Sequence, residues 1–171
     1  MNNFCILGPD NKEYWISRAM AVVVMVFAKD ENGNKYILAV ERGKGTPDPE
    51  YVGTYCLPCG YLDYNETLKQ AAIRELKEET GLTASDFQLK LVSINDNPEK
   101  DKRQNVTFRY KIDAVRTVES LSKELTLEFS EKDEVSNIAF INLKNIDDYK
   151  WAFNHKDLIK EYSYGTINIR Y

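Results

Sequence analysis

The sequence predicts an α/β fold in which helices pack on a mixed β-sheet. Three observations predict it: an early hairpin pattern, one uninterrupted helical pattern in the middle of the chain, and alternating apolar segments after that helix. The order of strands, helix, strands and helices is typical of domains that pack helices against one sheet. At 171 residues, the chain is expected to form one domain, 1–171.

The first predicted element is a β-hairpin. Residues 19–28 form the longest apolar run, residues 35–41 form a second strand, and Asn32-Gly33 lies at the centre of the segment between them. Asn-Gly between two such runs is a strong hairpin signal. The run 19–28 is too short to cross a bilayer. We therefore expect a buried strand and no membrane partner.

A helix is predicted over 67–80. Thr67 can cap its start, neither proline nor glycine interrupts it, and Gly81 can end it in a left-handed conformation. These signals set both ends of the helix.

Strands and short helices are predicted after this helix. Apolar residues alternate in the predicted strands 87–94 and 105–115, and a shorter strand is expected over 137–141. Short helices are predicted over 146–151 and 156–162. Two stretches rich in Gly, Pro, Asn and Asp are expected to be loops. They are 43–50 and 95–103.

Composition and charge limit the class of partner. The chain is 43% hydrophobic and 29% charged, as in globular proteins. Its first residues lack a basic start followed by a sustained apolar stretch, so we expect a cytoplasmic location. A net charge of −4 disfavours nucleic acid as a partner. A small phosphorylated substrate held through a metal is compatible with it, because the cation supplies positive charge.

The cysteines are interpreted as structural thiols. Three cysteines do not make a disulfide framework in a chain that can build its own core. Cys56 and Cys59 form a C-x-x-C pattern, which suggests a redox pair or half of a zinc site. Only Cys5 and the single histidine, His155, remain as further soft ligands, and two more ligands at metal spacing are missing, which favours the structural interpretation. His155 is expected to be hydrogen-bonded in the last helix rather than to contact substrate.

The helix 67–80 carries acids on the face that should pack inward. On a helical wheel of about 100° per residue, the small and apolar residues Ala72 and Leu76 define this face. Glu75, Glu78 and Glu79 fall inside or beside it. Carboxylates crowded on a partly buried face cost several kcal/mol each unless a cation compensates them.

One arginine cannot compensate all of these acids. Arg74 can pair with Glu78 or with Glu66, which leaves further carboxylates without a partner. Magnesium suits them, because this hard cation binds carboxylate and phosphate oxygens together. The alternative is a solvated acidic helix with ordinary ion pairs between successive turns.

The segment from Gly60 to Leu82 resembles the Nudix box. Gly60, Glu66 and the run Arg74-Glu-Leu-Lys-Glu-Glu-Thr-Gly-Leu82 match every defined position of that motif. Outside the box, a looser resemblance to the ADP-ribose pyrophosphatase branch rests on the hairpin and on two segments, 104–110 and 151–155. Together these place the core in about 16–162. The chain departs from the family at Cys59, where glycine is frequent.

The resemblance implies a Nudix-type α/β/α sandwich with a mixed β-sheet and a role for each matched acid. Glu75 and Glu79 would be the principal metal ligands, and Glu78 a further ligand or acid/base group. Glu66 and Arg74 would brace the start of the helix and orient Glu75. The implied cation is Mg²⁺, with Mn²⁺ as an alternative.

Other implied site residues lie outside the helix. Gly60 would permit a backbone turn that brings a carbonyl, that of Cys59, to the metal. The family often draws one more acid from a later loop. Glu134 is our candidate, ahead of Glu131 and Asp133, because it immediately precedes the predicted strand 137–141. A plain surface acid is the alternative for each of these three.

The implied function is cleavage of a pyrophosphate bond by a metal-activated water. ADP-ribose or a related nucleoside diphosphate sugar is the leading substrate, and a nucleoside triphosphate is an alternative. A rival function is a non-catalytic ligand-sensing module. Regulators of that kind carry a winged-helix domain, and we expect none in this chain. The resemblance also allows a homodimer.

Aromatic residues are candidates for stacking on a base or sugar, although core or rim packing is the alternative for each. These residues are Trp15, Tyr51, Tyr55, Tyr61 and Tyr64.

Overall fold

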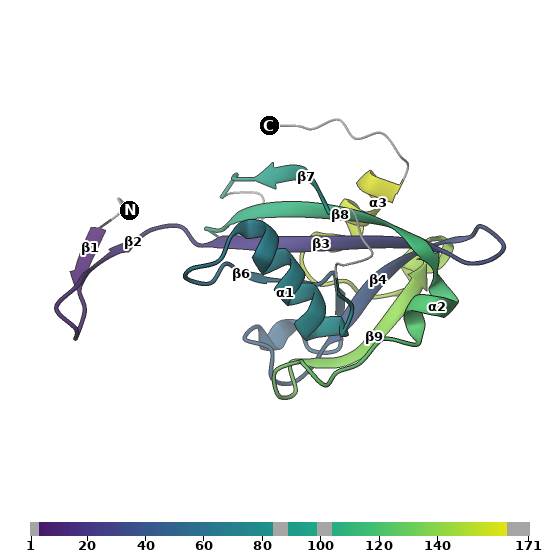
Figure 1. The fold of residues 1–171 in the computed structure, drawn as a ribbon, viewed down its shortest axis with the longest axis horizontal. Coiled ribbons are helices and arrows are strands. Elements are labelled where there is room, and N and C mark those ends of the chain that lie inside the picture. Colours follow the sequence, from purple (N-terminus) through teal and green to yellow (C-terminus); the bar gives the residue numbers. More distant parts are fainter. Residues whose placement is uncertain (1–3, 84–88, 99–103, 164–171) are drawn as a thin grey trace.

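A mixed β-sheet forms the centre of the computed structural model, which describes residues 4–83, 89–98 and 104–163 (Figure 1). Within these residues the large sheet has seven strands, ordered β5-β4-β3-β8-β7, with β6 paired to β3 and β9 paired to β4. β3 and β8 pair in parallel, and the other pairs are antiparallel. The strands are β3 (Met20–Lys29), β4 (Lys35–Arg42), β5 (Tyr55–Cys56), β6 (Cys59–Tyr61), β7 (Lys90–Asn95), β8 (Val106–Thr117) and β9 (Val135–Asn142).

Helices cover both faces of this sheet. Alternate residues of β3 point to opposite sides, and each side builds its own core cluster. One cluster joins the sheet to α1 (Leu68–Thr80) and α2 (Val118–Ser122), and the other joins it to α3 (His155–Ser163). Figure 1 shows α1 and α3 on opposite sides of β3. The predicted α/β/α sandwich is confirmed.

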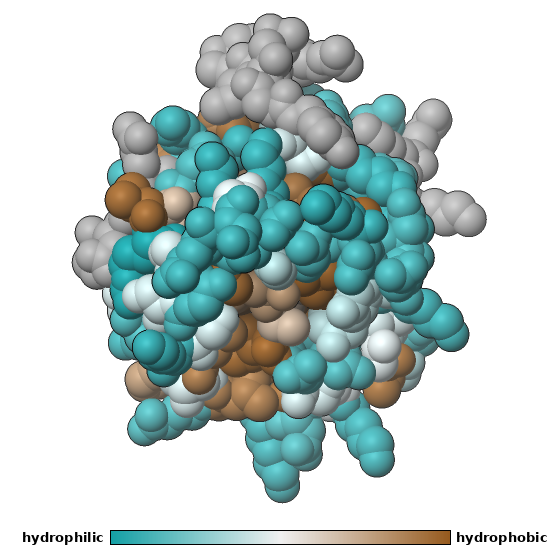
Figure 2. Space-filling view, turned by 90° about the vertical axis from the view of Figure 1, so that its right-hand side faces the viewer, coloured by the Kyte–Doolittle hydropathy of each residue, from teal (hydrophilic) through white to brown (hydrophobic). Residues whose placement is uncertain are grey.

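The predicted β3–β4 hairpin is confirmed. Asp30 organises its turn, because its side chain accepts hydrogen bonds from the backbone N–H groups of Asn32 and Asn34 at 2.9 and 2.8 Å. Gly33 occupies the left-handed region with φ of 80°. On the side of the molecule that carries this turn, hydrophobic atoms gather in the middle of a mainly hydrophilic surface (Figure 2).

Both ends of α1 lie where the sequence predicts them. The Thr67 side chain accepts a hydrogen bond from the Gln70 backbone, and the Gln70 side chain accepts one from the Thr67 backbone, which completes a capping box. Gly81 ends the helix with φ of 79°. The buried residues Ala71, Ala72 and Leu76 face the sheet as expected.

Two predicted elements differ from the structure. The helix predicted over 146–151 is a 3₁₀ helix, η3 (Leu143–Asp148), which ends earlier because Trp151 forms a β-bridge with Tyr55. The expected loop 43–50 runs into a second 3₁₀ helix, η1 (Pro49–Tyr51). The first residues of the strand predicted from 87 lie outside the described residues. Its described part is β7.

A small hairpin precedes the large sheet. Strands β1 (Phe4–Leu7) and β2 (Glu13–Ile16) form a separate two-stranded sheet that extends away from the rest of the molecule in Figure 1. Sequence patterns did not predict it, nor the short elements β5, β6 and α2. Among the described residues, no helix is both long enough and apolar enough to span a membrane.

Candidate active site

A cavity of about 270 Å³ lies beside the acid-bearing face of α1. α1 contributes Glu75, Glu78 and Glu79, and the segment before β9 contributes Glu131 and Glu134. The structure thus brings together acids that are far apart in the sequence. The remaining lining residues are Cys59, Gly60, Tyr61, Asp63, Arg74 and Ser130.

Arg74 and Glu66 brace the start of α1. The Arg74 Nη2 and Nε atoms donate to the two Glu66 carboxylate oxygens at 2.7 and 3.1 Å. Nη2 also donates to the Tyr61 carbonyl at 2.9 Å, which ties the helix to β6. Glu66 accepts the Asp63 N–H at 2.8 Å. These contacts lower the pKa of Glu66, chiefly through the hydrogen bonds from Arg74.

Arg74 also contacts two acids of its own helix. Its Nη1 atom donates to Glu75 at 2.7 Å and to Glu78 at 3.0 Å. The predicted pairs with Glu66 and Glu78 are therefore both present. Even so, burial raises the pKa of Glu75 to about 7, because desolvation outweighs the attraction of the guanidinium.

Glu79 is the most deeply buried acid of the cavity. Its exposed fraction is 4%, and its Oε2 atom accepts the Cys59 N–H at 3.1 Å. Burial raises the pKa of Glu79 well above its ordinary range, and the neighbouring Cys56, Glu75 and Glu134 raise it further. When ionised, the acids that line this cavity carry more negative charge than Arg74 can balance.

Gly60 makes room for Glu75. A Cβ atom at position 60 would lie 2.1 Å from Glu75 Oε1, so any side chain there would displace the carboxylate. Gly60 pairs with Val22 in the sheet, and its φ is not positive. The structure thus explains this glycine by its close approach to Glu75 and not by the backbone turn that we expected.

A tight contact between two loops places Glu134. The Gly43 and Gly45 N–H groups donate to the backbone carbonyls of Glu134 and Asp133, each at 2.7 Å. A Cβ atom on Gly43 would lie 2.2 Å from the Asp133 carbonyl oxygen, so the approach requires glycine. Glu134 is half-buried, and burial and the nearby Glu131 raise its pKa. Of the three candidate acids, Glu134 and Glu131 line the cavity.

A larger cavity of about 440 Å³ adjoins the acidic one. Cys59, Gly60, Tyr61 and Glu134 line both cavities. Its other lining residues include aromatic and cationic side chains that the sequence did not single out. They are Arg42, Arg109 and Phe153.

Phe153 is the centre of an aromatic cluster in the larger cavity. Its ring lies 4.7 Å from Tyr51 and 5.2 Å from His155, and the Arg42 guanidinium lies over it at 5.2 Å. Such rings and cations attract planar and anionic groups. His155 is buried, and its Nδ1 atom accepts the Leu57 N–H at 3.0 Å, in agreement with a hydrogen-bonded histidine.

The five aromatic candidates separate into three groups. Tyr51 and Tyr61 line the larger cavity. Tyr55 packs against Tyr149 and Trp151. Trp15 and Tyr64 are exposed, at 70% and 88%.

The donor set of the acidic cavity fits a hard divalent cation. It consists of carboxylate oxygens, which Mg²⁺ and Mn²⁺ bind well. A cation would also offset the desolvation and the repulsion between acids that raise the pKa of Glu75 and Glu79.

Comparisons with known proteins identify relatives in sequence and in fold. A family model described as the NUDIX domain matches residues 18–162. An ADP-ribose pyrophosphatase of Methanocaldococcus jannaschii is 31% identical over 153 residues, which cover 90% of this chain and 79% of that protein. The NUDIX domain of Shewanella oneidensis NrtR, solved with ADP ribose, superposes with a TM-score of 0.68 at 20% identity over 90% of each chain. A Nudix hydrolase of M. smegmatis, RenU, has a TM-score of 0.63 at 17% identity over 96% of this chain and 98% of its own.

The contact between position 60 and Glu75 can be tested by a double-mutant cycle. Gly60→Ala is expected to lower the free energy of unfolding by about 1–3 kcal/mol, because the added methyl group overpacks the site. In a Glu75→Ala background the same change should cost less than about 0.5 kcal/mol, because the carboxylate is gone. Urea unfolding of the four proteins measures both values. Equal costs in the two backgrounds would contradict the steric role of Glu75.

Proposed function

Because this chain belongs to the Nudix family, and is a pyrophosphohydrolase of that family, we propose that it cleaves the diphosphate of ADP-ribose with the help of Mg²⁺. A related nucleoside diphosphate sugar is the closest alternative substrate. One observation carries the proposal: buried acids from α1 meet Glu134 in a cavity that adjoins a larger one lined by aromatic and cationic side chains.

Glu75 and Glu79 would hold the cation, with Glu78 as a further ligand and the Cys59 carbonyl as a backbone donor. When bound, the cation would lower the pKa of a water molecule and neutralise charge on the phosphate oxygens. Mn²⁺ has the same preference for oxygen ligands and is the alternative cation.

The other residues of the site would position these ligands. Arg74 is fixed by both Glu66 oxygens and holds Glu75 from the same guanidinium. The Cys59 N–H holds Glu79. Preorganised contacts of this kind lower the cost of arranging charged groups during the reaction.

Glu134 would accept the proton of the attacking water. It lies at the border of the two cavities and is held there by the loop contact with Gly43. Burial keeps its pKa above the ordinary range of a carboxyl group, which suits a general base better than an exposed acid does.

The larger cavity would bind the rest of the substrate. Tyr51 and Phe153 can stack on a base, and Arg42 and Arg109 can attract phosphate groups. The M. jannaschii relative is an ADP-ribose pyrophosphatase, and the NrtR domain was solved with ADP ribose. Both facts favour ADP-ribose over a nucleoside triphosphate.

A second candidate function is ligand sensing without catalysis. The likeness to the NrtR domain favours it. The complete set of acids around the cavity favours hydrolysis, because a sensor has no need to crowd carboxylates at an energetic cost.

Hydrolysis can be tested directly. With Mg²⁺, the protein is expected to convert ADP-ribose and water to AMP and ribose 5-phosphate, measured by chromatography. Glu79→Gln should lower the rate at least about 100-fold, because it removes a proposed ligand charge. Glu161→Gln, an exposed change on α3, is the matched control and should retain the rate.

The outcomes separate the two candidate functions. Metal-dependent formation of AMP that is lost in Glu79→Gln but retained in Glu161→Gln supports the hydrolase. Tight binding of ADP-ribose by calorimetry without any product, for the wild type as for the variant, would favour the sensing module. Hydrolysis of nucleoside triphosphates but not of ADP-ribose would reject the proposed substrate and still support cleavage of a pyrophosphate bond.

The role of Glu134 can be tested against its neighbour. Glu134→Gln is expected to lower kcat about 10- to 100-fold with a small change in KM, because the proposed base acts in the transition state. Glu131→Gln should change kcat less than about threefold, since the role we assign to Glu134 does not require Glu131. Equal losses in both variants would instead indicate a shared electrostatic effect.

A homodimer and a cytoplasmic location stay predictions. Sedimentation equilibrium measures the first: a mass near twice 19.8 kDa supports a homodimer, and a single-chain mass contradicts it.

A further inference from the structure

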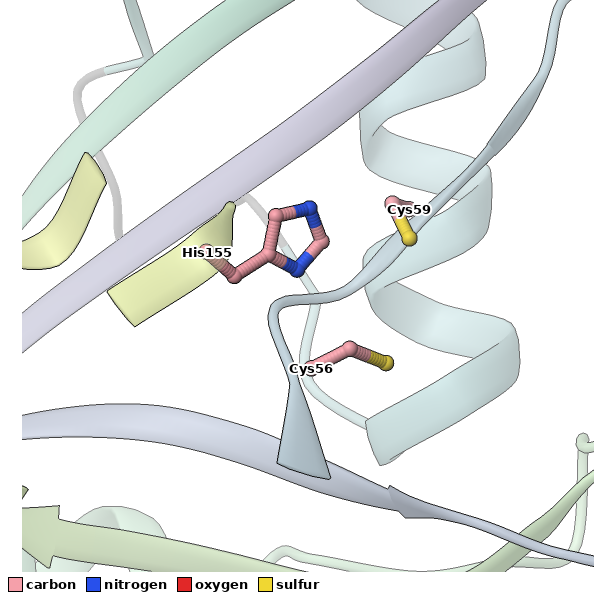
Figure 3. A group of neighbouring side chains, drawn as sticks. All are labelled: Cys56, Cys59 and His155. Carbon is pink, nitrogen blue, oxygen red and sulfur yellow. The ribbon is translucent and has the colours of Figure 1, made fainter. Parts of the chain in front are cut away.

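The two thiols of the C-x-x-C pattern and the chain's single histidine converge at one point. Among the described residues, Cys56, Cys59 and His155 each offer one ligand atom, and these atoms all lie within 4.8 Å of one another. Figure 3 shows the three side chains directed into a common space beside α1. We propose that they form a binding site for a single soft divalent metal ion, such as Zn²⁺, separate from the acidic site.

Long-range pairing explains why His155 lies beside the two thiols. Cys56 pairs with Val40 in β4, and Cys59 pairs with Val23 in β3, which fixes the turn between them. Tyr55 bonds to both sides of Trp151: its N–H donates to the Lys150 carbonyl and its carbonyl accepts the Ala152 N–H, each at 2.8 Å. This bridge places the start of α3 against the C-x-x-C turn.

The ligand chemistry fits zinc or a similar ion. Two thiolates and an imidazole are the protein ligands of one known class of zinc site, in which water or another group takes the fourth position. At a Zn–S distance of about 2.3 Å, two sulfurs of a tetrahedral site stand roughly 3.8 Å apart. Ligand atoms within 4.8 Å therefore need to close by only about 1 Å.

The site is partly prearranged. Cys56 is fully buried, and the exposed fraction of His155 is 4%. Nδ1 of His155 accepts the Leu57 N–H, so this nitrogen carries no proton, as a metal ligand requires. A metal bound at Nδ1 would take the place of that N–H, at the cost of one hydrogen bond.

The charged groups around the two thiols favour the binding of a cation between the sulfurs. Arg42 lies beside Cys56, with Nη1 at 3.9 Å from the sulfur, and it stabilises the thiolate that a metal binds. The acidic groups of Glu134 and Glu79 oppose the ionisation of Cys56 and Cys59, respectively. A divalent ion bound to both sulfurs would offset this repulsion and stabilise the thiolate form of each.

The two proposed metal sites select different ions because their ligands differ in softness. Thiolate and imidazole select Zn²⁺ and related ions, whereas Mg²⁺ prefers oxygen. Cys59 belongs to both neighbourhoods through different atoms, because its sulfur faces the thiol cluster and its N–H holds Glu79. This inference does not rest on the hydrolase activity.

Cobalt absorption tests the proposal. Co²⁺ is added to the reduced protein in excess Mg²⁺, which occupies oxygen sites, and absorption is followed in the near-ultraviolet and visible ranges. One equivalent of Co²⁺ is expected to produce thiolate charge-transfer absorption and the intense visible bands of a tetrahedral site. One equivalent of Zn²⁺ should then abolish both.

Variants assign the ligands. Cys59→Ser and His155→Gln are each expected to weaken Co²⁺ binding at least about 100-fold, more than the loss of a group that merely supports a ligand. Cys5→Ser is the matched control, because Cys5 is exposed and lies outside the cluster, and it should bind like the wild type. Circular dichroism checks each fold. Cys59 is the better test position, since it is less buried than Cys56.

Three results would overturn the proposal. The first is a fully reduced wild type that gives no charge-transfer absorption. The second is undiminished absorption in folded Cys59→Ser or His155→Gln. The third is a Cys56–Cys59 disulfide in protein purified without reductant, combined with no cobalt uptake after reduction, which would identify a redox pair instead.

Discussion

The burial of negative charge against the sheet is the constraint on which the site depends. Glu79 lies almost fully out of solvent, and Glu75 lies beside it, although each would be more stable in water as a carboxylate. Three nearby features accommodate them: a position without a side chain at Gly60, a backbone N–H at Cys59, and the guanidinium of Arg74. The negative charge that these features do not balance would favour the binding of a cation.

The sheet turns this local arrangement into a two-part cavity. β6 runs beside β3 and carries Gly60 under the helix, while the turn that follows β4 holds the loop before β9. Glu134 therefore lines the same cavity as the helix acids and also borders the larger cavity. The acidic cavity and the larger cavity share lining residues, so a substrate that fits the larger cavity would place its diphosphate near the acids.

Local signals explain what could be predicted from the sequence. Thr67 and Gly81 end α1 through contacts within a few residues, and Arg74 reaches Glu78 across one helical turn. Long-range pairing explains what could not. β5 and β6 are too short to show a period, and η3 ends at Asp148, before Trp151 bridges to Tyr55. This bridge and the strand pairs of Cys56 and Cys59 together place the thiols beside His155.

The bridge between Tyr55 and the segment 150–152 has a further consequence. Two backbone hydrogen bonds fasten this segment to β5, and the residues just beyond it reach both the larger cavity and the thiol cluster. Phe153 and His155 are therefore expected to move together with this segment when it opens. Any local opening that breaks these two bonds would remove an aromatic wall of the cavity and withdraw the imidazole from the thiols in a single step.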